Sequence, residues 1–229
     1  MNKGCGVWMA TLLMTAGLGG GAVGESRTVA YDVWFKDAVA ATQTVSIARA
    51  DGSTTVTASF AAQLHVFVAQ HPYSEDLAAT FRDDGTVERF QAVRIDGPQR
   101  TEVTGELQDD ERLRVIRTDA QGVATSFIAR ADYDFHSLIL YGRAPADFLP
   151  ARGPARVLQI AEGFVQPMVI QTISESETTT ERQHVSSTHL IWTSDTSTSH
   201  SWHPDRFGDV PRRYVRQTPN GEFTFQLPR

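Results

Sequence analysis

The sequence is poor in cysteine and in lysine. Cys5 is the one cysteine among 229 residues, which excludes an internal disulfide and a multi-cysteine metal site. Of the 21 basic residues only Lys3 and Lys36 are lysines, and 27 acidic residues bring the net charge to −6. So acidic a chain lacks the basic footprint of a nucleic-acid-binding protein, and we expect no nucleic-acid partner.

The familiar catalytic motifs are missing as well. The sequence contains no G-x-S-x-G, no H-E-x-x-H and no G-x-x-x-x-G-K-[ST]. Residues 19–24 match G-x-G-x-x-G, but an apolar run precedes them and a β-type alternation follows. A dinucleotide site needs a strand before this motif and a helix after it. The sequence therefore identifies no catalytic residue and favours a protein that is not an enzyme.

Long apolar runs are also absent. Gly6–Gly17 is apolar but short and interrupted by glycine, and small residues follow at 22–24. This order is typical of a secretory signal peptide, and the run is too short for a comfortable membrane span. We expect residues 1–24 to be removed near the Gly24-Glu25 bond. Residues 25–229 would then form a single β domain, periplasmic or secreted, without a transmembrane anchor.

The rest of the chain has the pattern of an antiparallel β-sheet. Residues 56–68 alternate between apolar and polar for most of their length, which is longer than a typical strand and suits a strongly curved sheet. Asp51-Gly52, Asp84-Gly85 and Asn220-Gly221 are hairpin signals, because glycine adopts the positive φ that tight turns require. We therefore expect a mainly β protein whose curved antiparallel sheet forms a half-barrel or open barrel.

Residues 132–141 interrupt this pattern. The segment is apolar without clean alternation, and Asp134 can cap a short helix that carries Leu138 and Tyr141. A loop rich in proline and glycine follows, and the sheet resumes at Val157. We expect one short helix here, closing the open end of the sheet.

Several motifs in the second half of the chain are similar to those of known proteins. In chain order they are Asp134-Phe135-His136-Ser137 with Tyr141-Gly142-Arg143, Ile191-Trp192-Thr193-Ser194-Asp195, Pro211-Arg212-Arg213-Tyr214, and the run from Gly221 to Leu227. They resemble a domain-of-unknown-function family of secreted or periplasmic proteins from Gram-negative bacteria, in which a signal peptide precedes a curved antiparallel sheet. The layout of the tail is also similar to the C-terminal half of Lol-type lipoprotein carriers, which form a half-barrel around an apolar cavity. The resemblance implies a fold and a cavity, and it transfers no catalytic residue.

The first functional hypothesis is a carrier or binding protein of the cell envelope. A lipid, a lipoprotein-like molecule or another amphipathic ligand would lie against the concave face of the sheet, because that face of a half-barrel serves both as core and as ligand cavity. The residues expected to line this cavity are Phe60, Leu64, Val66, Leu138, Tyr141 and Trp192.

A metal-binding protein or metal-dependent enzyme is the alternative. His189, His200, His203 and Asp205 are candidate ligands for zinc or copper. Residues three apart on a strand point to opposite faces, so His200 and His203 converge only if the chain turns, which Pro204 favours. If these histidines are instead solvated loop residues, the protein needs no cofactor.

Two further interpretations concern the strands near the C-terminus. Arg206, Arg212, Arg213 and Arg216 can form an anion site, because guanidinium groups match carboxylates and phosphates. The same charges can instead protect an exposed edge strand from pairing. A structural or assembly factor that offers an edge strand to a partner is the third functional hypothesis.

Overall fold

The described residues of the computed structural model form one 15-stranded sheet. They are residues 24–35, 38–66, 69–141, 152–178, 184–195, 197–204, 210–218 and 221–228. The strands are β1 Glu25–Phe35, β2 Ala38–Ala50, β3 Ser53–Val66, β4 Ala69–Arg82, β5 Val87–Asp96, β6 Gln99–Leu107, β7 Arg112–Asp119, β8 Gly122–Ala129, β9 Phe135–His136, β10 Arg152–Gln159, β11 Phe164–Thr178, β12 His184–Thr193, β13 Thr198–Pro204, β14 Arg213–Thr218 and β15 Gly221–Gln226.

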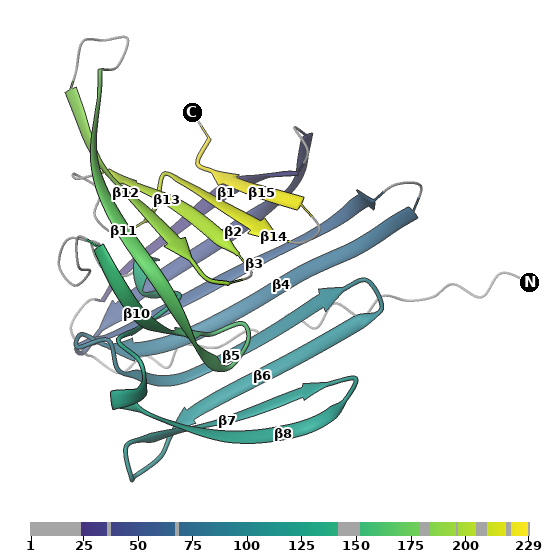
Figure 1. The fold of residues 1–229 in the computed structure, drawn as a ribbon, viewed down its shortest axis with the longest axis vertical. Helices are drawn as coiled ribbons and strands as arrows, with labels where there is room; N and C mark the ends of the chain where they lie inside the picture. Colours follow the sequence, from purple (N-terminus) through teal and green to yellow (C-terminus); the bar gives the residue numbers. More distant parts are fainter. Residues whose placement is uncertain are drawn as a thin grey trace, which may run out of the picture.

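The sheet consists of two runs of hairpins that meet where the chain's first and last strands pair. Strands β1 to β8 follow one another outward from the centre, and β15 to β10 do the same on the other side. The pairs are antiparallel except for β9 with β10, which is parallel. The sheet coils, so that β10–β14 lie across the inner face of β3–β6 (Figure 1). The expected mainly β fold with a curved, open antiparallel sheet is confirmed.

The turn signals explain where the first hairpins form. Asp51 and Gly52, with φ of 52° and 75°, join β2 to β3, and Gly85, with φ of 82°, lies between β4 and β5. The long alternation at 56–68 corresponds to β3, which has 14 residues and ends at Val66; residues 67 and 68 lie outside the described residues.

The interrupted segment contains short 3-10 turns in place of one short helix. Arg130–Asp132 and Ile139–Tyr141 are the 3-10 turns, and β9 lies between them. β9 pairs with Val157 and Leu158 of β10. This pairing uses the backbone groups that a continuous helix would need. Within the described part of the chain, no helix has both the length and the apolar character to cross a membrane.

The main core lies inside the coil, where aromatic side chains of β15 join the two runs of hairpins. The Phe223 ring lies 4.9 Å from that of Phe35 and 5.5 Å from that of Tyr73. The Phe225 ring lies 5.5 Å from that of Phe60. A second cluster of buried apolar residues is formed by side chains of β9–β12 and of the 3-10 turn Ile139–Tyr141. Together these contacts hold the two halves of the sheet around its inner space.

Candidate functional site

A cavity of about 460 Å³ lies on the inner side of the coiled sheet. Leu64 and Leu77 line it from β3 and β4, and Leu138, Trp192 and Phe225 line it from the opposite half. The alternation of β3 explains its contribution, because residues two apart face the same side of a sheet. In β3 the inward positions are 56, 58, 60, 62 and 64, all of them apolar and buried.

The structure places most of the expected cavity residues at this site. The four that line it are Leu64, Leu138, Tyr141 and Trp192. Phe60 lies beside the lining rather than in it, with its ring 5.6 Å from that of Tyr73. The backbone of Val66 pairs with Ala69, and its side chain lies outside the described residues.

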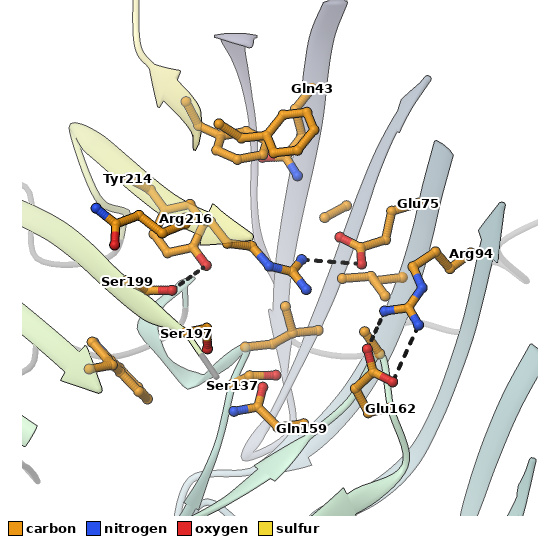
Figure 2. Close-up of a pocket in the computed structure, with 18 of the residues that line it drawn as sticks. Gln43, Glu75, Arg94, Ser137, Gln159, Glu162, Ser197, Ser199, Tyr214 and Arg216 are labelled. Carbon is orange, nitrogen blue, oxygen red and sulfur yellow. Dashed lines mark hydrogen bonds and ion pairs between the residues drawn. The ribbon is translucent and has the colours of Figure 1, made fainter. Parts of the chain in front are cut away.

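Charged side chains also face the cavity, and the sequence reasoning missed most of them. Figure 2 shows Glu75, Arg94, Glu162 and Arg216 around the cavity. Arg216 was expected in an anion site, but not inside the sheet. A signal was present, because Glu75 occupies an inward position of β4 between Tyr73 and Leu77. A charge at a position where the alternation predicts an apolar residue is a reason to expect a polar function there.

An ion pair between distant strands spans the cavity. Oε1 of Glu75, a residue only 6% exposed, lies 3.5 Å from Nη1 of Arg216. Burial by itself lowers the pKa of Arg216, but Glu75, Tyr214 and Tyr73 raise it by more, so the pKa lies above its ordinary range. Arg216 therefore stays charged, and its charge is compensated inside the protein.

A second ion pair lies beside the first. Arg94 donates to both carboxylate oxygens of Glu162, the longer contact being 3.4 Å. Arg117 of β7 also contacts Glu162, with Nη1 3.4 Å from Oε2. Glu162 thus ties the β10–β11 turn to β5 and β7 across the coil.

Three tyrosines add hydroxyl groups to the cavity. Burial raises the pKa of Tyr141 well above its ordinary value, and burial together with Glu75 raises the pKa of Tyr73 to about 12. Both are therefore uncharged phenols at neutral pH. The Tyr214 hydroxyl donates to Ser199 Oγ over 3.4 Å (Figure 2). Apolar, phenolic and paired ionic groups in one cavity suit a ligand that is itself amphipathic.

The candidate metal ligands are divided between the two faces of the sheet. His189 of β12 and His200 of β13 lie together, with Nε2 of the first 3.1 Å from Nδ1 of the second. Both rings stack on Trp202, at centroid distances of 4.3 and 5.8 Å. The guanidinium of Arg213 lies 5.0 Å from the centroid of the Trp202 ring. Burial, followed by the charge of His189, lowers the pKa of His200.

His203 does not join this pair. The expected turn is not formed, because β13 continues as a strand through Pro204, and His203 therefore faces the side opposite to His200. His203 is buried, its Nε2 lies 3.1 Å from Ser201 Oγ, and burial lowers its pKa to about 4. Asp205 lies outside the described residues. Within the ranges that the structure describes, no group of three or more His, Cys, Asp or Glu side chains is arranged to hold a metal ion.

The candidate anion site is divided in the same way. Arg213 lies over the outer Trp202, whereas Arg216 lines the inner cavity. The backbone N–H of Arg212 donates to the Trp202 carbonyl, and Arg206 lies outside the described residues. Of the three described arginines of this cluster, Arg216 is the one placed at the cavity.

Comparison with known proteins supports the fold. No family model matches the chain, and no curated protein matches it. Among solved structures it is similar to a β-barrel-like protein of the domain of unknown function DUF1849 from Brucella abortus. The two are 10% identical with a TM-score of 0.60, and the match covers 88% of this chain and 95% of that one. At this identity the likeness shows a common architecture and no common activity.

Proposed function

We propose that this protein is a non-catalytic binding or carrier protein that holds an amphipathic molecule inside its coiled sheet. The observation that carries the proposal is the cavity of about 460 Å³, within the range of small-molecule sites, about 300–1,000 Å³. Its leucine and aromatic walls suit an acyl or similar apolar chain. Its tyrosine, serine and ion-paired groups suit a polar head.

The test uses a neutral amphiphilic probe, N-phenyl-1-naphthylamine, whose fluorescence rises in apolar surroundings. Ser199 is half-buried and faces the cavity, so Ser199→Trp fills the space from the sheet side. We expect this variant to bind the probe at least tenfold more weakly. Val123→Trp, at a position 70% exposed on β8, is the matched control and should bind as the wild type does. Equal binding by the two tryptophan variants would refute the cavity as the site.

The proposal extends to the compartment. We propose that the protein works in the periplasm or outside the cell after cleavage near Gly24-Glu25. The start of β1 at Glu25 supports this, because cleavage there would leave the first strand whole. N-terminal sequencing of protein from the envelope fraction should give Glu25 or a neighbouring residue as the first.

We also propose membership of the secreted domain-of-unknown-function family that the motifs resemble, which the shared architecture supports.

Metal binding on the outer face is the second candidate, favoured by the 3.1 Å approach of two imidazole nitrogens. A Zn²⁺ or Cu²⁺ ion would be held by His189 and His200, with solvent completing its coordination. Calorimetric titration with each ion should show one site that His200→Ala removes. His71→Ala is the control, because His71 lies elsewhere and pairs with Asp96. Equal loss of binding in both variants, or none in either, would exclude this site.

A further inference from the structure

Four of the charged side chains that line the cavity, Glu75, Arg94, Glu162 and Arg216, form one row of alternating charge that crosses the coil and ends at Arg117, whereas Asp96, which also lines the cavity, pairs with His71. Arg216 of β14 contacts Glu75 of β4, and Glu75 is the cross-strand neighbour of Arg94 on β5. Arg94 pairs with Glu162 of the β10–β11 turn, which Arg117 of β7 also contacts. Each inner member of this row therefore has an opposite charge on both sides.

Arg216 is the member at the cavity end of the row. Its one ionic contact is a single 3.5 Å approach to Glu75, and no other hydrogen bond of its side chain occurs among the described residues. A guanidinium carries five N–H donors, so most of those of Arg216 remain available. Its side chain lines the cavity and is 30% exposed, so it is not closed off from a molecule bound there.

We propose that the bound molecule is an anionic amphiphile whose carboxylate or phosphate head is held by Arg216, a proposal that rests on the binding function proposed above. A guanidinium pairs with such a head through two parallel hydrogen bonds, which are strongest away from bulk water. Tyr214 and Ser199 lie next to Arg216 and supply hydroxyl groups for the same head (Figure 2). The apolar tail would lie on Leu64, Leu138 and Trp192.

Glu75 competes with the ligand head in this arrangement. When a head group occupies Arg216, the carboxylate of Glu75 still has Arg94 beside it on the neighbouring strand. The exchange therefore leaves no charge without a counter-charge. It also predicts opposite effects for the two partners: removing the charge of Arg216 weakens anion binding, and removing the charge of Glu75 strengthens it.

The experiment compares four amphiphiles with the same twelve-carbon tail, each below its micellar concentration and each displacing N-phenyl-1-naphthylamine. They are tridecanoate, dodecyl phosphate, dodecyltrimethylammonium and dodecyl maltoside. We expect at least one of the two anions to bind tenfold or more tightly than the cation, and the tighter anion identifies the head as carboxylate or phosphate. Arg216→Gln should reduce anion affinity at least tenfold and change maltoside affinity less than twofold. Glu75→Gln should raise anion affinity several-fold.

The outcomes separate this inference from the binding function. Equal affinity for anion, cation and maltoside would overturn the anionic head and leave the cavity function intact. Failure of all four amphiphiles and of the probe would overturn both. If Arg216→Gln fails to fold, as judged by its thermal melt, Glu75→Gln decides. If the Glu75–Arg216 ion pair serves only to join β4 and β14, Glu75→Gln gives no gain in anion affinity. An anion affinity of Glu75→Gln that is equal to or lower than that of the wild type would therefore refute the proposal.

Discussion

At the scale of single residues, Gly163 combines a left-handed backbone with close packing, in the turn that lies against the opposite half of the sheet. Its φ is +71°, and an added Cβ would lie 2.4 Å from Cγ1 of Val103 and 2.9 Å from Cγ1 of Val115. Gly52 has nearly the same φ, +75°, but a Cβ added there would lie 3.7 Å from its nearest neighbour, Oδ2 of Asp83. A comparison of alanine substitutions at the two glycines therefore separates the cost of backbone strain from the cost of crowding.

We predict that Gly163→Ala is clearly more destabilising than Gly52→Ala. The left-handed backbone costs about 1–2 kcal/mol for alanine at either position. The clash adds about 1–3 kcal/mol at position 163, because Val103 and Val115 are fully buried and cannot move freely. Urea denaturation measures the free energy of unfolding of both variants. Equal losses would mean that the turn is not packed against β6 and β7.

Buried histidines give the protein a defined response to acid. His136 is fully buried and its pKa is lowered to about 3, first by burial and then by Arg130. Burial lowers the pKa of His203 to about 4. Free imidazole has a pKa of about 6.5, so below that pH the unfolded chain binds more protons than the folded one. The stability that these residues provide is complete above pH 6.5 and is lost as the pH falls.

We predict that stability decreases between pH 6 and pH 4.5 and that His136→Phe makes this decrease shallower. Each neutral buried histidine contributes a slope of about 1.4 kcal/mol per pH unit in this range. The slope of stability against pH should be smaller in the variant by the contribution of one histidine, since a phenyl ring takes the place of the imidazole beside Phe81. Urea denaturation at a series of pH values tests this. His71→Gln is the control, because it keeps both buried imidazoles and should retain their contribution to the slope of stability against pH. An unaltered slope in His136→Phe would contradict the prediction.

At the scale of elements, β8 stands apart from the other long strands. It is an edge of the sheet, and six of its eight residues are exposed, including Val123 at 70% and Phe127 at 53%. β3, in contrast, has a paired strand on each side and an inward face of buried residues. Free energy of local opening follows the number of buried contacts, so the two strands should differ strongly.

We predict that the amides of β8 exchange with deuterium at least a hundredfold faster than those of β3. Hydrogen exchange followed by mass spectrometry at low protein concentration measures both. Raising the protein concentration is the control, because self-association through this edge would slow exchange in β8 alone. Equal protection of β8 and β3 in dilute solution would show that the edge is covered.

At the scale of the whole molecule, the pairing of β1 with β15 decides the architecture. It joins the two runs of hairpins, and Phe225 packs against rings from both of them, Phe60 of β3 and Tyr214 of β14. The strands that pair here lie at opposite ends of the chain. Such long-range contacts form late and slowly in folding, because the loop that they close is long.

We predict that Phe225→Ala destabilises the protein by about 3–5 kcal/mol, the usual cost of removing a buried phenyl group. Phe127→Ala is the matched control, since that ring is half-exposed on β8 and has Arg112 at 5.2 Å as its cation–π neighbour. Its loss should cost less than about 1 kcal/mol. Chemical denaturation of the two variants gives the comparison, and a small loss in Phe225→Ala would mean that β15 does not link the two halves.

The sequence by itself determined the local structure of this protein. Alternation such as that of β3, and glycines such as Gly52 and Gly85, act between near neighbours, so strands, faces and turns follow from them. The same local rule indicated that His200 and His203 point to opposite faces unless the chain turns, and it leads to the inward positions that Leu64 and Glu75 occupy. The structure lacks the expected single short helix because β9 pairs with β10, a contact that no local pattern shows.

Only the tertiary structure decided which distant side chains meet. Glu75 and Arg216 lie 141 positions apart, and their contact depends on the coiling of the whole sheet and on the pairing of β1 with β15. The same coiling sorts the arginines of β14, so that Arg216 faces the cavity and Arg213 the outer surface. Spacing along the chain determines on which face of a strand a side chain lies, but it does not determine which residues lie opposite that face. The core, the cavity and its charges therefore come from the fold, built on strands that the sequence specifies locally.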